Sequence, residues 1–308
     1  MSQAKGMMFL DTGHPILAET LKKRFSAKKH EPVDISFADF DGVRYRVFSD
    51  PSSPSQLKVS IRMAAYESLK GNGLEEVLSG AYGGLVESSP DEDFDLTLKI
   101  DLDNLNGKPE DLVKSVSELK RNLMGGLFTR YFDALCDGKA ESLGSLTVDY
   151  RSTESMYIIP GDDRVVVVYS VDFSDATDRA VAGVFLQEFA EAQRHVSNAP
   201  PVAFSRDAPR EIRGIKNVRD DGSMVGFVSF AVFKHHVDGT RGDRNNVITL
   251  LQSFRAYLDY HIKASKSYLH TRMRRRVNEL LKVLNRAHPL SEEKKEKKTM
   301  KGRTFTRK

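Results

Sequence analysis

The chain has 308 residues, which is enough for two domains of ordinary size. Hydrophobic residues make up 40% of it and charged residues 29%, a balance typical of soluble globular proteins rather than disordered ones. No apolar run reaches the roughly 18–20 residues that a membrane-spanning helix needs, and the apolar start is interrupted at Asp11, too soon for a secretory leader. The single cysteine, Cys136, cannot close an intrachain disulfide, so we expect a reducing, cytoplasmic compartment.

The net charge of +4 hides an uneven distribution. Residues 245–308 hold 17 Lys and Arg against 5 Asp and Glu, whereas residues 1–244 hold 30 against 38. An acidic body therefore carries a strongly basic C-terminal fifth. This asymmetry indicates an anionic partner for that end of the chain, such as nucleic acid, a lipid surface or an acidic protein.

The first third of the chain predicts a short helix followed by strands. The helix covers residues 16–28, and alternating apolar and polar residues predict strands at 33–37, 43–47, 57–61 and 94–100. The turn residues Asp39 to Gly42 join the first two strands into a hairpin. A helical stretch is predicted near 64–78, broken or kinked by Gly71 and Gly73.

The same order of elements then recurs. A long helix is predicted from Pro109 to Gly138, with strands at 146–150, 156–159, 164–171, 202–205 and 224–233 and a helix at 176–195. The short connections favour antiparallel pairing. We therefore predict an α+β protein with two tandem domains of similar helix/antiparallel-sheet plan, followed by a long C-terminal helix. The predicted segments are a first α/β domain (1–107), a second α/β domain (108–243), the long helix (244–288) and a basic tail (289–308).

The long helix predicts a protein partner. Residues 246–287 contain neither Pro nor Gly, and Pro289 follows as a stop signal. Such a helix is about 60 Å long. A domain with a radius of gyration of about 14 Å is too small to cover its whole length. Its apolar row nevertheless continues almost to the end. The predicted subunit interface consists of Phe254, Leu258, Ile262, Leu269, Met273, Val277, Leu280 and Leu284.

Basic residues occupy the opposite side of the second half of this helix. With about 100° per residue, Arg272, Arg275, Lys282 and Arg286 fall opposite the apolar row, with Arg276 at its edge. The tail adds Lys294, Lys295, Lys297 and Lys298. One side of the helix is thus suited to protein and the other to a negatively charged surface.

The sequence offers no positive evidence for catalysis. It contains no nucleophile elbow and no His-Glu-x-x-His motif. His235 and His236 are adjacent near a predicted strand end and should point to opposite faces, which argues against a shared metal. Asp39 and Asp41 flank a turn, where Asp is common for local hydrogen bonding. We predict no catalytic residue, no cofactor and no metal site.

Several segments match a known family. They are Phe37–Val43, Met156–Tyr157, Phe185–Phe189, Ala199–Pro200, Ser253–Lys263, Tyr268–Arg274, Leu281–Ala287 and Lys301–Phe305. In order and spacing the chain resembles the family of subunit 2 of the actin-related protein 2/3 complex, from about Met8 to the C-terminus. The segments Met1–Met7, Pro51–Pro54 and Arg206–Asp221 depart from that pattern.

The resemblance implies a non-catalytic structural subunit. Its long helix would pair antiparallel with the equivalent helix of subunit 4, and the pair would form the core that clamps the two actin-related subunits. The resemblance also implies binding to the side of the mother actin filament during branched nucleation, and a location in the actin cytoskeleton at the cell cortex and in projections. From their position opposite the apolar row, we predict that the basic residues of the helix and tail named above make the filament contacts.

Two other readings use the same basic residues. A nucleic-acid-binding protein could use the Arg272–Arg286 stripe and the tail, but no binding motif accompanies them and no aromatic residues interleave with them. A basic helix could also lie on anionic lipid. We favour the actin-related function, without nucleic acid and without stable membrane insertion.

Overall fold

A computed structural model describes residues 11–105, 108–216, 218, 224–240 and 242–284, and the backbone of 297–298 and 304–305. The chain forms two compact units, Met1–Lys263 and Ala264–Lys308. The first unit contains two antiparallel sheets in tandem, and the long C-terminal helix α7 (Arg244–Leu284) begins in it. The predicted α+β plan is therefore confirmed. No helix among the described residues is long and apolar enough to cross a membrane.

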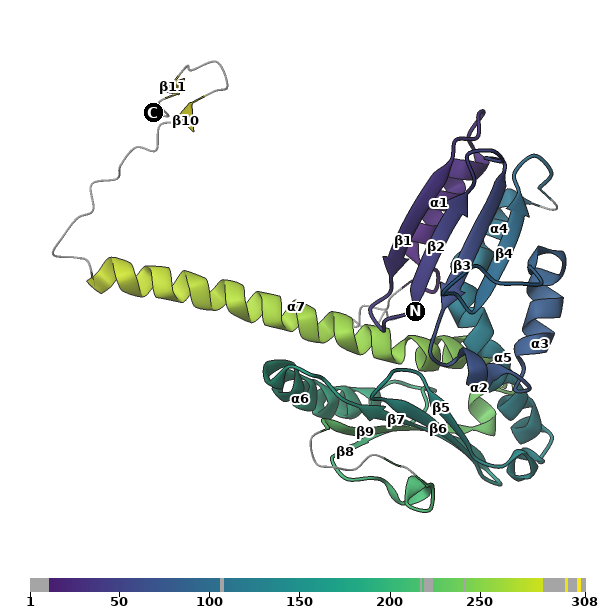
Figure 1. The fold of residues 1–308 in the computed structure, drawn as a ribbon. Coiled ribbons are helices and arrows are strands. Elements are labelled where there is room, and N and C mark those ends of the chain that lie inside the picture. Colours follow the sequence, from purple (N-terminus) through teal and green to yellow (C-terminus); the bar gives the residue numbers. More distant parts are fainter. Residues whose placement is uncertain are drawn as a thin grey trace. The chain divides into compact units, whose positions relative to one another are not determined.

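The first sheet is a four-stranded antiparallel meander in the order β1-β2-β3-β4. Its strands are β1 (Val33–Ala38), β2 (Arg44–Ser49), β3 (Gln56–Arg62) and β4 (Leu96–Asp101). Helices α1 (Pro15–Phe25) and α4 (Pro109–Ser117) lie on one face of it (Figure 1). Alternate strand residues such as Tyr45, Val47 and Val59 are buried against these helices, as period-two patterning requires.

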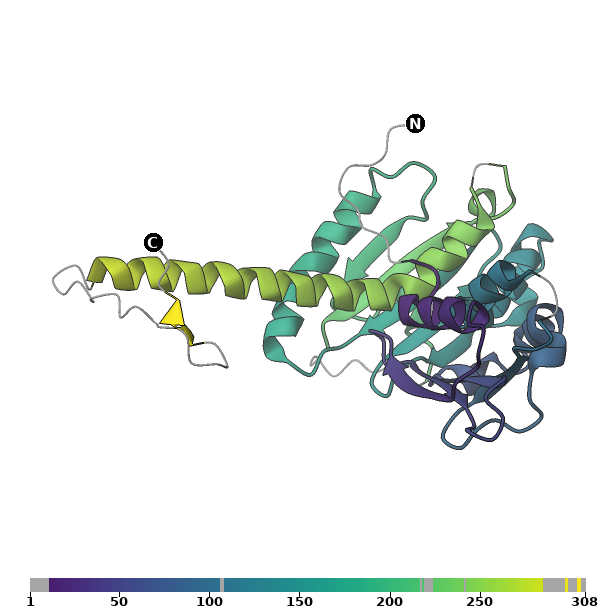
Figure 2. The same cartoon turned by 90° about the horizontal axis from the view of Figure 1, so that it is seen from above.

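The second sheet has five strands in the order β5-β6-β7-β9-β8. Its strands are β5 (Leu146–Asp149), β6 (Ser155–Pro160), β7 (Arg164–Val171), β8 (Val202–Ser205) and β9 (Gly226–Phe233). Helix α6 (Ala176–Gln193) and the first turns of α7 lie on the same side of this sheet (Figure 2). Asp175 caps α6 by accepting hydrogen bonds from the backbone N–H groups of Thr177 and Asp178.

Two predicted helices are divided. The stretch at 64–78 forms α2 (Tyr66–Leu69) and α3 (Leu74–Val77), because Gly71 and Gly73 take positive φ angles; the predicted break at these glycines is confirmed. The predicted helix from Pro109 ends at Ser117, and α5 (Leu119–Cys136) starts after a local break at Glu118. The closing signal is confirmed, since Gly138 has φ +69°.

Short elements complete the chain. They are η1 (Leu78–Tyr82), η2 (Gly83–Leu85), η3 (Ala140–Leu143), η4 (Arg210–Ile212), η5 (Lys234–His236), β10 (Lys297–Lys298) and β11 (Thr304–Phe305). The strand before His235 and His236 ends at Phe233, and η5 brings the two imidazole centroids within 4.1 Å. The expectation that these rings point to opposite faces of a strand is therefore wrong. Strands β10 and β11 pair antiparallel.

Candidate interaction surface on the C-terminal helix

The first half of α7 is part of the core of the first unit. Phe254, Leu258 and Ile262 are 1%, 0% and 0% exposed. The Phe254 ring lies 5.1 Å from that of Phe230 and 5.2 Å from that of Tyr169, both on the second sheet. These three residues were predicted to face another subunit, but here their own unit already covers them. An interface along this row therefore depends on the residues beyond Ile262.

A buried ion-pair network fixes this half of α7. Arg255 donates two hydrogen bonds to Glu154, at 2.8 and 2.9 Å, and also pairs with Asp259 at 2.6 Å. Its guanidinium lies 4.4 Å from the centre of the Phe173 ring. Burial opposes the charged form, but Glu154 outweighs it and raises the pKa of Arg255. The bidentate geometry sets the rotation of α7 about its own axis within this unit.

Sequence reasoning missed this network. Arg255 and Asp259 stand one helical turn apart, which is a recognisable ion-pair spacing, but their common neighbour Glu154 is 101 residues from Arg255. The detectable signal was a charged pair, Arg255 and Asp259, each placed directly after a residue of the apolar row, Phe254 and Leu258.

The apolar row becomes exposed in the second unit. Eight of the thirteen exposed large hydrophobic side chains of the described chain lie between residues 268 and 284. Five of them form the predicted row: Leu269 (50% exposed), Met273 (68%), Val277 (53%), Leu280 (57%) and Leu284 (67%). All five lie within about 40° of Met273 around the helix. Leu281 and Val283, which were not predicted, are also exposed and extend this apolar face to about 80° from Met273 on either side.

The opposite side of the same segment is basic. Residues 264–284 contain six Lys and Arg and one acidic residue, Glu279. Arg272, Arg275, Arg276 and Lys282 are all exposed, as is Arg274, which was not predicted. Arg275 pairs with Glu279 at 3.2 Å, and Arg272 lies over the Tyr268 ring. Arg286, Lys294 and Lys295 lie outside the described residues, and only the backbone is described for Lys297 and Lys298.

The arrangement suits binding rather than chemistry. An exposed apolar face of this size usually marks a protein interface, and a cluster of exposed cations attracts an anionic surface. Within the described residues, no group of three or more His, Cys, Asp or Glu side chains is placed to hold a metal ion.

Comparison with known proteins identifies relatives along nearly the whole chain. Residues 59–291 match the family model described as the Arp2/3 complex 34 kD subunit, p34-Arc. Actin-related protein 2/3 complex subunit 2 of Dictyostelium discoideum is 37% identical over 284 residues, covering 92% of this chain and 94% of the relative. The protein of the same name from Schizosaccharomyces pombe is also 37% identical, covering 98% of this chain and 100% of the relative.

Proposed function

The chain belongs to the family of the 34 kD p34-Arc subunit of the Arp2/3 complex, and we propose that in this complex it pairs with subunit 4, clamps the two actin-related subunits and contacts the mother filament. Members of this family are non-catalytic subunits with a role in actin nucleation, and they work in the cytoplasmic actin cytoskeleton. The finer location that we propose is the cell cortex and its projections.

The exposed apolar row of α7 supports the proposed pairing. Leu269, Met273, Val277, Leu280 and Leu284 extend over about four turns of helix with no covering element among the described residues. Burying such a row against a second helix removes apolar surface from water at about 25 cal/mol per Å². The antiparallel helix of subunit 4 is the partner that we infer from the family.

The basic side supports the proposed filament contact. Arg275 and Lys282 lie about 160–180° from Met273 around the helix axis. A helix that pairs through its apolar row therefore still presents these cations to a second surface. Actin filaments carry an acidic surface, which gives the electrostatic complementarity that such a contact needs.

Co-expression with subunit 4 tests the pairing. The double variant Met273→Asp, Leu280→Asp places two charges in the proposed seam, and burying an unpaired carboxylate costs several kcal/mol. We expect it to abolish co-purification of the two subunits. The single variant Asn278→Asp, about 140° from Met273, should pair as the wild type does. Equal recovery of subunit 4 with both variants would exclude this row as the interface.

A further inference from the structure

A short exposed turn joins α6 to β8 in the first unit. Residues 194–198 are all exposed. The backbone N–H of Ala199 donates to the carbonyl of Val196 at 3.4 Å, and Asn198, the third residue of this turn, has φ +61°. A positive φ at the third position is typical of a type II turn, and Asn tolerates it. Ser197 is the second residue of the turn and therefore stands at an exposed corner of the chain.

The hydroxyl of Ser197 is accessible. It makes no hydrogen bond to another described residue. The side chain lines an open cavity of about 560 Å³ between this turn and the start of α7, which leaves room for a phosphoryl group. Few backbone bonds hold the segment, chiefly the turn bond and the N–H of Val196 donating to Gln193 at 3.1 Å. Such segments open at low cost, and a protein kinase binds its substrate in an extended conformation.

Arg194 stands three residues before Ser197 and gives the turn a charge signal. Its side chain is 69% exposed and pairs with Glu191, itself 59% exposed, at 2.7 Å. An exposed ion pair of this kind contributes little, so Arg194 can exchange its partner. Kinases that select basic substrates receive such an Arg between acidic side chains, where its guanidinium forms bidentate pairs.

The structure distinguishes Ser197 from the other residues with this spacing. An Arg stands three positions before a Ser or Thr three times in the sequence, in the segments Arg46–Ser49, Arg194–Ser197 and Arg303–Thr306. Ser49 is 2% exposed in β2, and its hydroxyl accepts a hydrogen bond from the backbone N–H of Val33 at 3.1 Å. Thr306 lies outside the described residues. Of the two described hydroxyls, that of Ser197 alone combines the spacing with exposure.

We propose that Ser197 is a phosphorylation site for a serine kinase that selects Arg three residues before its target. In this reaction Ser197 Oγ attacks the γ-phosphorus of magnesium-bound ATP, the bond from that phosphorus to the bridging oxygen breaks, and ADP leaves. The catalytic Asp of the kinase takes the hydroxyl proton. The product carries about −1.5 to −2 charges at pH 7 on a side chain that was neutral.

The new charge changes the surface of the first unit only. Arg194, which pairs with Glu191, can pair with the phosphate three residues further along the chain instead. The exposed apolar row of α7, Leu269 to Leu284, lies in the second unit. The proposal is therefore independent of the pairing with subunit 4 and of the filament contact.

Kinase treatment of the complete complex tests the proposal. We would incubate the complex with magnesium-bound ATP and calcium/calmodulin-dependent protein kinase II, a kinase that selects Arg at this position, and map the modified residues by mass spectrometry. We expect nearly complete phosphorylation of Ser197 and none of Ser49. The absence of phosphate from Ser197 would overturn the proposal, whether or not Ser26, which follows Lys23 at the same spacing, is modified.

Two synthetic peptides separate the motif from its structural setting. Peptides of residues 43–52 and 191–200 present the same Arg spacing in an accessible chain, so the kinase should phosphorylate Ser49 in the first and Ser197 in the second. In the folded complex only Ser197 should remain a substrate. Failure of the 191–200 peptide would show that the motif is not recognised. Equal phosphorylation of Ser49 and Ser197 in the folded complex would remove the structural basis of the proposal.

Matched variants of the complete complex test the role of Arg194. Arg194→Ala removes the recognised cation and should lower the initial rate of Ser197 phosphorylation by about tenfold or more, as expected when a desolvated charge pair is lost. Arg179→Ala removes another Arg of α6, outside the recognised segment, and should leave that rate unchanged. Equal rates for Arg194→Ala and the wild type would show that the kinase does not recognise Arg194, which would overturn the proposal.

Discussion

His236 stabilises the end of strand β9 through a hydrogen bond that its imidazole ring accepts. Its Nδ1 accepts a hydrogen bond from the backbone N–H of Phe233 at 3.0 Å, and the side chain is almost fully buried. Burial, with a smaller effect of His235, lowers the pKa of His236 to about 4. The ring is therefore neutral at pH 7, and protonation would remove the acceptor that Phe233 uses.

This pKa shift predicts a pH-dependent local stability. Because the folded-state pKa lies below the ordinary 6.5, the stabilisation is complete above pH 6.5 and declines as the pH falls toward 4. We expect a loss of about 1–2 kcal/mol at pH 5, measured as reduced protection of the Phe233 amide from hydrogen exchange in the intact complex. His236→Asn keeps an acceptor that does not titrate, so its protection should not change with pH. The same decline in this variant would contradict the assignment.

Two adjacent glycines in α5 have different structural roles. A Cβ on Gly126 would collide with the backbone carbonyl of Gly73, just before α3, whereas a Cβ on Gly125 would meet only a methyl group of Ile248 at 3.4 Å. Gly73 itself has φ +98°, a conformation that other residues rarely adopt. The close approach of α3 to α5 therefore requires Gly126 but not Gly125.

A matched pair of variants tests this packing. Gly126→Ala should destabilise the subunit by about 2 kcal/mol or more, because two backbones must separate. Gly125→Ala should be neutral or slightly stabilising, since Ala is favoured over Gly in helices by about 0.8–1 kcal/mol. The measurement is the thermal denaturation midpoint of the purified complex. A similar decrease for both variants would show that helix context, rather than the Gly73 contact, controls the effect.

Local patterning predicted these elements better than it predicted their contacts. The period-two strands and the i, i+4 row of α7 are properties of short windows, and both were found in the structure. The depth to which that row is buried was not predictable, because Phe254 is covered by Phe230 and Tyr169, which the tertiary fold brings to it. The break at Glu118 lacks Gly or Pro and gave no local signal.

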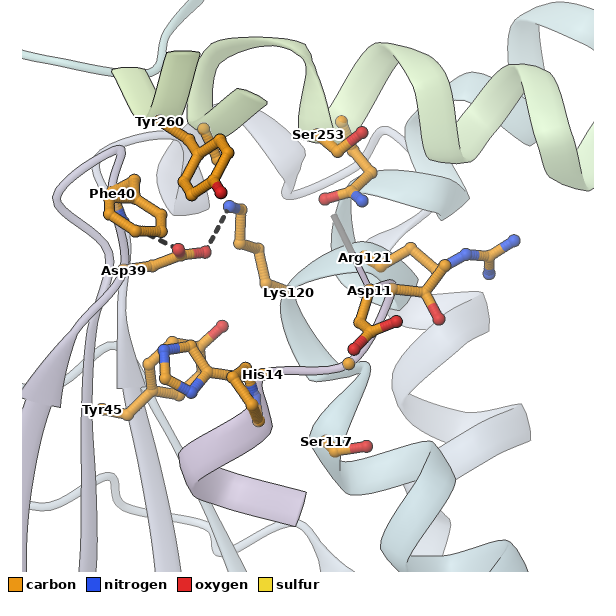
Figure 3. Close-up of a pocket in the computed structure, with 15 residues that line it drawn as sticks. Asp11, His14, Asp39, Phe40, Tyr45, Ser117, Lys120, Arg121, Ser253 and Tyr260 are labelled. Atoms are coloured by element: carbon orange, nitrogen blue, oxygen red, sulfur yellow. Dashed lines mark hydrogen bonds and ion pairs between the residues drawn. The ribbon is translucent and has the colours of Figure 1, made fainter. Parts of the chain in front are cut away.

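The ion pairs that Lys120 makes with Asp39 and Asp41 show the same limit, and Figure 3 shows the pair with Asp39. Asp39 and Asp41 were interpreted as turn residues, which they are, since each accepts a hydrogen bond from a nearby backbone N–H group. Their second role depends on Lys120, which lies 81 residues beyond Asp39. Nothing in the spacing of the sequence indicates which distant cation will neutralise a turn carboxylate.

Across the whole molecule, charge is segregated as the sequence count indicated. Within positions 264–284, Arg275 and Lys282 face away from the apolar row and Arg276 lies at its edge, so one helix can serve both pairing and filament contact. Exposed ion pairs contribute only about 0–1 kcal/mol each, so a single Arg→Ala change should be nearly silent. Reversing several charges adds repulsion to the lost attraction and should give a measurable defect.

The filament proposal therefore predicts a defect for Arg275→Glu, Arg276→Glu, Lys282→Glu in a complex of unchanged subunit composition. We expect affinity for filaments in co-sedimentation to fall by about tenfold, with a parallel fall in branching rate. The matched control reverses three exposed lysines of the first unit, Lys22, Lys23 and Lys28, which gives the same change in net charge. The control should bind and branch like the wild type if position, rather than net charge, is decisive.

The salt dependence of filament binding tests whether the substitutions act through lost electrostatic contacts. Salt screens exposed charges with a Debye length of about 10 Å at 0.1 M, so wild-type binding should weaken as salt rises. The variant has already lost these contacts, so its binding should change less and the difference between the two should narrow. A constant difference at all salt concentrations would mean that the substitutions act through shape or assembly. Normal binding and branching by the variant at physiological salt would exclude the basic stripe as the filament contact and leave an anionic lipid or nucleic acid as its partner.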